Sequence, residues 1–229
     1  MTLGLLLLHA LPLDGTMWNG LRDLLPTATS APTLYGFGDT LEDWARGALE
    51  TTDAERLIVV GCSVGGSCAI EVAIAAPERV AALVLIGTKA RRRLDPAQRR
   101  QAVDIIHERG LNEAWRTFWQ PLISTSASLD VIEQVKNITL AQSPADVARG
   151  VEVFHTRPSR DAFLPAFQKP VVIVTGADDI APGYATSAVQ AREAPRGRLH
   201  VEPACGHYVP LEKPDAIRAI LAELVAELA

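Results

Sequence analysis

Continuous apolar runs of strand length recur along the chain. The strongest lie at Leu3–Leu8, Leu57–Cys62, Ala82–Ile86 and Val171–Thr175. Their hydrophobicity is continuous rather than alternating, which is typical of strands that are buried on both faces in a parallel sheet with helices on either side. Weaker strand candidates are Thr33–Tyr35 and Arg198–Val201.

Helical patterns separate these runs. Apolar residues have helical spacing in Thr40–Glu50, Val64–Ala75 and Pro214–Leu228, and Pro77 closes the second of these segments. Alternation of strand and helix predicts an α/β fold with a doubly wound, mostly parallel sheet. Functional loops in such a fold gather at the carboxyl ends of the strands.

The alternation stops after Gly87, and strand character resumes only near Val171. The intervening helical segments lie near Pro96–Glu108, Asn112–Gln120, Leu129–Leu140 and Pro144–His155. We therefore predict a core of residues 1–88 and 162–229, and a helical lid of residues 89–161 over the strand ends. Aromatic side chains are frequent in the lid, at Trp115, Phe118, Trp119 and Phe154. Some of these rings would join the lid helices, and one or two would line a pocket.

Composition and charge narrow the function classes. The 229 residues are 48% hydrophobic and 21% charged, as in ordinary globular proteins. The formal net charge of −5 argues against a nucleic-acid-binding protein, which usually has a basic face. The arginines at 91–93, with Arg99 and Arg100, are a local exception. We interpret them as a solvated loop and helix face, and the alternative is a docking patch for an acidic substrate or partner.

The first apolar run predicts neither export nor membrane insertion. It is too short for a membrane span, and no Lys or Arg precedes it as in a signal peptide. We therefore expect a cytoplasmic protein. In a reducing compartment Cys62, Cys68 and Cys205 would be free thiols that serve as small packing residues. The alternative is that Cys62 or Cys205, each close in sequence to a candidate catalytic residue, makes the protein sensitive to thiol reagents.

A candidate nucleophile lies where the second strong strand meets a helix. The segment Gly61-Cys62-Ser63-Val64-Gly65 has the pattern Gly-x-Ser-x-Gly. This five-residue pattern also occurs by chance in Gly-rich loops, but between a strand and a helix it is typical of a nucleophile elbow. The turn is tight enough to strain the serine backbone and expose its Oγ, and the flanking glycines avoid collisions with neighbouring elements. Ser63 is therefore the predicted nucleophile.

A serine nucleophile needs a base and a group that orients the base. His207 follows the last strand, in a loop that can reach back over the elbow. His107 and His155 fall in lid helices and His200 in a strand, so we interpret them as packing or surface residues. The acid is sought after the Val171–Thr175 strand, where two carboxylates are adjacent. Their side chains should point different ways. We prefer Asp179 as the partner of His207 and expect Asp178 to form an Asx-turn or a helix cap.

The loop after the first strand is the candidate oxyanion hole. It can present the backbone N–H of Leu11 opposite that of Val64, while Pro12 has no N–H to offer. His9 is expected to brace this loop by hydrogen bonding. His9 and Tyr208 are also candidate pocket residues, together with the four lid aromatics.

These segments together resemble the α/β-hydrolase superfamily over nearly the whole chain. Residues 5–18, LLLLHALPLDGTMW, are similar to the family's first strand and His-Gly oxyanion loop, with Ala10 where glycine is usual. Residues 35–40, YGFGDT, are similar to its Gly-x-Gly-(Asp/His)-Ser loop. Ser63, Asp179 and His207 follow one another in the family's order. The likeness is greatest to small lidded esterases and enol-lactonases, such as 3-oxoadipate enol-lactonase, and to the MenH-like and C–C bond hydrolase group.

The resemblance implies a sheet of about six strands in the spatial order 2-1-3-4-5-6, with two N-terminal strands of the family trimmed. It also implies a serine hydrolase that cleaves a small-molecule carboxylic ester or lactone through an acyl-enzyme. We expect no cofactor, no metal, no nucleic-acid or membrane partner, and a monomer or homodimer. Alternatives are a MenH-like or hydroxynitrile-lyase-like lyase, a C–C bond hydrolase with the same triad, or a non-catalytic ligand-binding protein.

Overall fold

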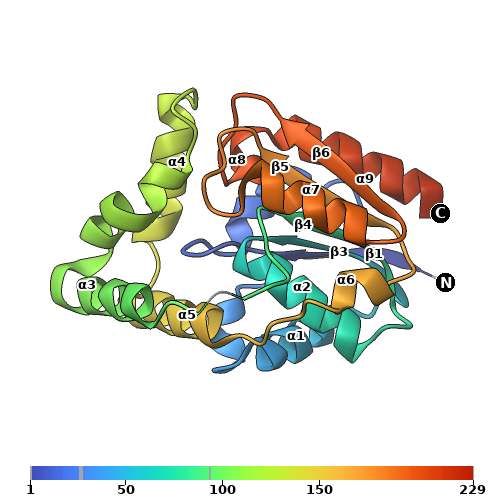
Figure 1. The fold of residues 1–229 in the computed structure, drawn as a ribbon, viewed down its shortest axis with the longest axis horizontal. Coiled ribbons are helices and arrows are strands. Elements are labelled where there is room, and N and C mark those ends of the chain that lie inside the picture. Colours follow the sequence, from blue (N-terminus) through green and yellow to red (C-terminus); the bar gives the residue numbers. More distant parts are fainter. Residues whose placement is uncertain (1, 26–27, 93, 229) are drawn as a thin grey trace.

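The computed structural model of the protein describes residues 2–25, 28–92 and 94–228. Within these residues a single parallel sheet of six strands has the order β2-β1-β3-β4-β5-β6 (Figure 1). The strands are β1 (Leu3–Leu8), β2 (Thr29–Ser30), β3 (Arg56–Cys62), β4 (Val80–Ile86), β5 (Val171–Gly176) and β6 (Gly197–Glu202). The predicted fold class and strand order are confirmed.

The second strand is not where the sequence predicted it. Thr33–Tyr35 is not a strand, because Leu34–Phe37 forms the 3₁₀ turn η2, and β2 is a two-residue strand that pairs with Leu5 and Leu6. The reason lies in the loop after β1. The Leu34 N–H donates to His9 Nε2 (2.9 Å), and the Tyr35 hydroxyl donates to the Leu13 carbonyl (2.8 Å). These groups bind a neighbouring loop instead of a sheet ladder.

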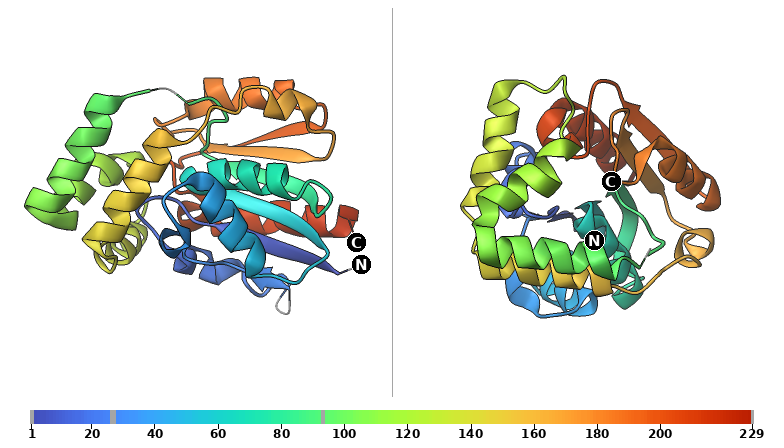
Figure 2. Two further views of the ribbon diagram at one scale, coloured as in Figure 1. Left: turned by 90° about the horizontal axis from the view of Figure 1, so that it is seen from below. Right: turned by 60° about the vertical axis from the view of Figure 1, so that its left-hand side comes forward.

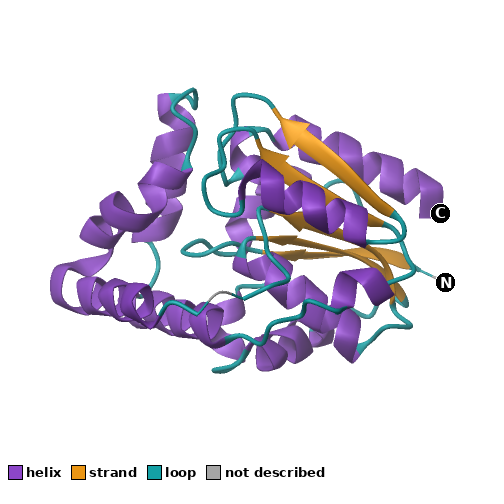
Figure 3. Cartoon of the chain, in the orientation of Figure 1, coloured by secondary structure: helices purple, strands orange, loops and turns teal. Residues whose placement is uncertain are grey.

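Helices cover both faces of the sheet, which explains the continuous apolar runs. In the view of Figure 1, α1 (Leu41–Glu50) and α2 (Val64–Ala75) lie below β1 and β3, while α9 (Pro214–Leu228) lies above them. The 3₁₀ helix η1 (Gly15–Leu21) packs with α9, and α7 (Gly183–Glu193) flanks β5 and β6. Figure 3 shows the same layers coloured by element type.

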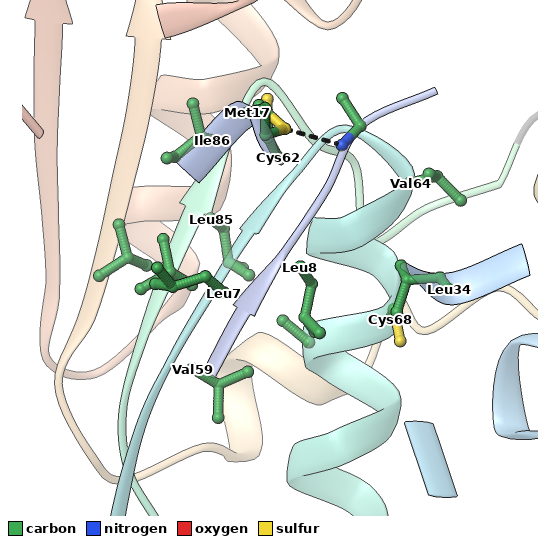
Figure 4. Packing of buried hydrophobic residues seen from close by; sticks show 14 of the residues in the cluster. Leu7, Leu8, Met17, Leu34, Val59, Cys62, Val64, Cys68, Leu85 and Ile86 are labelled. Atoms are coloured by element: carbon green, nitrogen blue, oxygen red, sulfur yellow. Dashed lines mark hydrogen bonds between the residues drawn. The ribbon is translucent and has the colours of Figure 1, made fainter. Parts of the chain in front are cut away.

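The core is densest between the central strands and α2. Residues 64–73 of α2 are all buried, so this helix is enclosed by protein, and its buried charge at Glu71 is paired with Arg160 (2.7 Å). Figure 4 shows Leu8 pointing toward α2 and Cys68, while Leu7 points to the opposite face of the sheet beside Leu85. Cys62, Cys68 and Cys205 are free and buried. This packing fixes the first turn of α2 against the ends of β1 and β3.

The segment between β4 and β5 contains helices joined by loops, and no strand, among its described residues. It contains α3 (Pro96–Ala114), the π-helical turn η3 (Trp115–Trp119), η4 (Gln120–Leu122), α4 (Leu129–Leu140) and α5 (Pro144–Thr156), and α6 (Phe163–Ala166) follows. A break at Gly110 (φ 78°) divides α3 where the sequence predicted a division. Figures 1 and 2 place α3, α4 and α5 at the end of the molecule opposite the two termini, beyond the carboxyl ends of the strands.

The predicted helical insertion is present between β4 and β5. Its role as a separate lid and its limits at residues 89 and 161 stay predictions, as does a cytoplasmic location. Among the described residues, no helix is both long and apolar enough to cross a membrane.

Candidate active site

The turn between β3 and α2 holds Ser63 in a strained conformation. Its φ of 55° and ψ of −117° lie in a region that side-chain-bearing residues rarely adopt. Glycine is required on both sides. A Cβ on Gly61 would lie 2.2 Å from the Gly65 carbonyl oxygen, and a Cβ on Gly65 would lie 2.2 Å from the Leu8 carbonyl oxygen. The Ser63 N–H donates to the Ile86 carbonyl (2.8 Å) and the Thr88 hydroxyl donates to the Ser63 carbonyl (2.6 Å). The structure therefore has the geometry expected of a nucleophile elbow.

His207 and Asp179 form a buried pair. His207 Nδ1 lies 3.1 Å from each carboxylate oxygen of Asp179, and the two residues are 2% and 5% exposed. An ionised carboxylate only accepts hydrogen bonds, so the proton must sit on Nδ1, which leaves Nε2 of the neutral ring free to accept one. The Ala181 N–H donates to Asp179 Oδ1 (2.8 Å) and fixes the carboxylate plane.

The adjacent carboxylate of Asp178 points elsewhere. Asp178 is exposed, and its Oδ2 accepts a hydrogen bond from the Ser124 hydroxyl (2.5 Å) in the segment after η4. The expectation of an Asx-turn or cap at Asp178 is therefore wrong. The local turn is made by Asp179, which accepts from the N–H two residues later. Asp178 instead joins the loop after β5 to the helical insertion.

Glu212 organises the loop that carries His207, and it was not among the residues predicted from the sequence. It lies on the one-turn helix α8 (Val209–Glu212). Its carboxylate accepts hydrogen bonds from the N–H groups of Gly206 (2.8 Å) and Tyr208 (3.1 Å), the residues on either side of His207. It also accepts from the Ser124 N–H (3.0 Å), while the His207 N–H donates to the Leu122 carbonyl (2.8 Å). The signal in the sequence was an acidic residue one short turn after the candidate base.

Hydrogen bonds hold the loop after β1 beside the turn that carries Ser63. His9 is fully buried; its Nδ1 contacts the Ala10 carbonyl (3.0 Å) and its Nε2 accepts from Leu34. Burial lowers the pKa of His9 from 6.5 to about 4, so the ring is neutral and braces the loop as expected. Met17 Sδ accepts from the Ala10 N–H (Figure 4), and the Tyr208 hydroxyl donates to the Leu11 carbonyl (3.1 Å). Leu11 thereby lies at the cavity beside Ser63.

Val64 is the first residue of α2, immediately after Ser63. The N–H groups in the first turn of a helix have no partner within the helix and carry the positive end of its dipole. The backbone amides of Leu11 and Val64 therefore remain the predicted oxyanion donors. Leu11 lines the cavity, and Val64 begins α2.

A cavity of about 410 Å³ lies between the strand ends and the helical insertion. Ser63 and His207 open onto it, as do Leu11 and Gly87. From the insertion it is lined by Gln98, Ala102, Phe118, Trp119, Leu122, Val151, Phe154, His155 and Arg157. The remaining lining residues are Thr88, Lys89, Ile180, Ala181 and Pro182.

Three of the six candidate pocket residues lie at the cavity, and their role in binding stays a prediction. Phe118, Trp119 and Phe154 line the cavity, whereas His9, Trp115 and Tyr208 do not. Each is almost completely buried in packing around the site, because the His9 ring and the Tyr208 hydroxyl are engaged in loop hydrogen bonds and Trp115 is enclosed among the helices. His155 was interpreted as a packing residue, but it faces the cavity together with Arg157, which the sequence reasoning missed.

The arginines of the basic run mainly fit the interpretation as solvated surface residues, and the cysteines fit the interpretation as packing residues. Arg91 is exposed and paired with Asp161 (2.8 Å), and Arg99 lies 3.5 Å from Glu152. Residue 93 of the same run lies outside the described residues. Burial raises the pKa of Cys62, so this residue stays a neutral thiol that packs behind the histidine loop and donates to the His207 carbonyl.

The comparison with known sequences identifies the family. A family described as "Alpha/beta hydrolase family" matches residues 5–220. The chain belongs to this family. The predicted family and an enzyme of the α/β-hydrolase type are therefore confirmed, while the roles assigned to individual residues stay predictions.

Named relatives of this α/β hydrolase share about a quarter of its residues. It is 26% identical to a 2-hydroxymuconate semialdehyde hydrolase of Pseudomonas sp. strain CF600, covering 97% of this chain and 87% of that protein. It is 27% identical to a pimeloyl-[acyl-carrier protein] methyl ester esterase of Aromatoleum aromaticum, covering 96% and 97%. Among solved structures, a thermophilic esterase from Thermogutta terrifontis with malate bound has a TM-score of 0.88 at 27% identity, covering 99% and 90%.

Proposed function

We propose that this α/β hydrolase is a serine hydrolase that cleaves a carboxylic ester or lactone through an acyl-enzyme on Ser63. The observation that carries the proposal is the buried His207–Asp179 pair, with His207 Nδ1 3.1 Å from both carboxylate oxygens, on the same cavity as a serine in a strained elbow. With Nδ1 engaged by Asp179, the second ring nitrogen of His207, a residue that lines the cavity, is the one that can act as a base. A base oriented in this way is what a serine hydroxyl needs to become a nucleophile.

The chemical steps follow from these groups. His207 Nε2 takes the proton of Ser63 while Oγ attacks the ester carbonyl, and Asp179 stabilises the imidazolium that forms. The N–H groups of Leu11 and Val64 donate to the oxyanion of the tetrahedral intermediate. His207 then gives its proton to the leaving alcohol oxygen and the acyl-enzyme forms. Water, deprotonated by the same Nε2, attacks the acyl-enzyme; the bond from the acyl carbon to Ser63 Oγ then breaks, His207 returns the proton to Oγ, and the acid is released.

The helical insertion contributes the pocket in this proposal. Phe118, Trp119 and Phe154 supply apolar walls for the substrate and, as parts of a lid, keep bulk water from the acyl-enzyme. A cavity of about 410 Å³ matches a small-molecule substrate. Relatives named as esterases support the ester as the substrate class.

A lyase or a C–C bond hydrolase that uses the same residues is the second candidate. It has support from a relative named as a 2-hydroxymuconate semialdehyde hydrolase and from another named as a putative 2-succinyl-6-hydroxy-2,4-cyclohexadiene-1-carboxylate synthase. A lyase would use His207 for proton transfer and would form no acyl-enzyme. Product analysis separates these classes, since only ester hydrolysis yields an acid and an alcohol.

The test is turnover of p-nitrophenyl acetate by the wild type and by Ser63→Ala. We expect the variant to keep its fold and to lose nearly all activity. Ser187→Ala is the matched control, because Ser187 is a serine on α7 away from the cavity lining and has a buried hydroxyl without a partner among the described residues. This control should keep wild-type activity. Equal turnover by Ser63→Ala would defeat the proposal.

A further inference from the structure

One wall of the cavity carries a buried cation that the proposed mechanism does not use. Arg157 follows α5 directly, lines the cavity and is only 5% exposed. Burying a charged group without a counter-ion is expensive in free energy. Charged side chains are therefore rarely buried unless they are paired.

Protein groups accept hydrogen bonds from only some of the N–H donors of the Arg157 guanidinium. Nη1 donates to the Phe154 carbonyl, and the guanidinium carbon lies 3.9 Å above the Phe154 ring centre. Nε is buried without any hydrogen-bond partner in the part of the chain that the structure describes. Within the same residues, no carboxylate pairs with Arg157. Capping the last turn of α5 accounts for Nη1 but leaves Nε unexplained.

The electrostatics of the surrounding wall favour an anion. Burial and, secondarily, nearby Arg92 lower the pKa of Arg157 from 12.5 to about 10, so it stays charged at neutral pH. His155 and Lys89 also line the cavity, and none of its lining residues is an Asp or Glu. A guanidinium has a planar fork of donors that matches a carboxylate. The same lining also has apolar residues, among them Phe118, Trp119 and Val151.

We propose that Arg157 binds a carboxylate on the substrate, so that the preferred substrate is an ester or lactone with a second, free carboxylate away from the bond that is cleaved. This inference rests on the proposed function and deepens it. Arg157 would pair with the carboxylate in both the ground state and the transition state, because that group does not react. Its contribution therefore belongs chiefly to substrate binding and to kcat/KM.

The experiment compares esters that differ only in a terminal carboxylate. Monomethyl succinate, glutarate and adipate are each paired with the methyl ester in which a methyl group replaces the free carboxylate, namely methyl butyrate, pentanoate and hexanoate. Three further variants are assayed with the wild type: Arg157→Met, Arg157→Lys and Arg149→Met. Arg149 is the matched control, because it lies on α5, the helix that Arg157 follows, but faces Asp39 and the Tyr35 carbonyl and is not part of the cavity lining.

The wild type should prefer the acid ester by at least about tenfold at one chain length, as expected for a charge-assisted pair. Arg157→Met should lose kcat/KM on that acid ester by about 10- to 100-fold while the neutral ester stays within about threefold. Arg157→Lys should keep part of the preference, and Arg149→Met all of it. The melting temperature of Arg157→Met should not fall, because the substitution removes an unpaired buried charge. A merely structural arginine would instead lower the melting temperature and both rates together.

Two results would overturn the carboxylate site while leaving the serine hydrolase intact. One is equal wild-type turnover of acid and neutral esters at every chain length. The other is an acid-ester preference that Arg157→Met retains. If no ester is hydrolysed at all, the proposed function fails, and calorimetric titration with glutarate decides the site alone. Binding to the wild type but not to Arg157→Met supports it, and no binding to either refutes it.

Discussion

Gly87 is a position where even a methyl group should disturb the pair of His207 and Asp179. It follows β4, has φ +54° and faces the His207–Asp179 pair. A Cβ at this position would lie 2.8 Å from His207 Nδ1, 2.9 Å from Cε1 and 3.2 Å from Asp179 Oδ2. Ordinary contact begins near 3.4 Å, so the imidazole must retreat by about 0.6 Å. The predicted perturbation is therefore a displaced base, caused by Gly87→Ala.

The expected loss of activity is large and separable from backbone strain. Misplacing a reacting group by 1 Å can lower the rate by about 100-fold, so we predict that kcat/KM falls by about 30- to 100-fold. An Ala at positive φ also destabilises the fold by about 1–2 kcal/mol. Gly183→Ala isolates that strain, because Gly183 has φ +68° and a Cβ there would meet no atom within 4 Å.

The assay is p-nitrophenyl acetate hydrolysis below the KM, with urea unfolding of both variants. Gly183→Ala should lose stability but keep its rate within about threefold, since the strain penalty acts on folding and not on the imidazole. Wild-type kcat/KM in a folded Gly87→Ala variant would refute the reasoning. So would equal loss of activity in both variants, because strain alone would then explain it.

Three further predictions address the groups around the base. Asp179→Asn should lower kcat by about 10⁴-fold with the fold intact, because an amide stabilises the wrong imidazole tautomer. In the control Asp178→Asn, kcat should stay within about fivefold of the wild-type value. Similar losses in both variants would contradict the assignment. Glu212→Gln should lower both the melting temperature and kcat, because its carboxylate accepts from the N–H groups on both sides of His207; an unchanged rate would mean that Leu122 alone positions the loop. Burial of neutral His9, with its pKa near 4, means that the unfolded chain takes up a proton below pH 6.5 and the folded chain does not. Stability should therefore fall by about 2 kcal/mol between pH 7 and pH 5, and His9→Gln should flatten that dependence in urea titrations.

The sheet could be predicted because its strands are covered on both faces. Burial of both faces leaves an uninterrupted apolar run, and β1, β3, β4 and β5 were found in that way. The helices α2 and α9 begin and end at the predicted residues. β2 could not be predicted, because a strand of two residues has no period. The apolar residues near Leu34 are buried by the loop after β1.

The pocket was harder to predict than the pair of His207 and Asp179. Strand ends of a parallel sheet must meet at one edge, so the order of the motifs was enough to bring His207 and Asp179 together. Which lid aromatic faces the cavity depends on how each helix is rotated. Trp115 and Trp119 lie in one π-helical turn, yet only Trp119 reaches the cavity lining. Arg157 carries no local signal, because its place at the cavity depends on how the helical insertion packs over the strand ends. Glu212 had only a weak signal, an acidic residue shortly after the candidate base.

The most direct test of the central claim is to trap the covalent intermediate. Wild-type protein is mixed with p-nitrophenyl acetate, quenched in acid within the first turnovers and weighed intact by mass spectrometry, followed by peptide mapping. We expect one added acetyl group on the peptide that contains Ser63, and none in Ser63→Ala. Hydrolysis without any acylation of Ser63, or acylation at another residue, would contradict it.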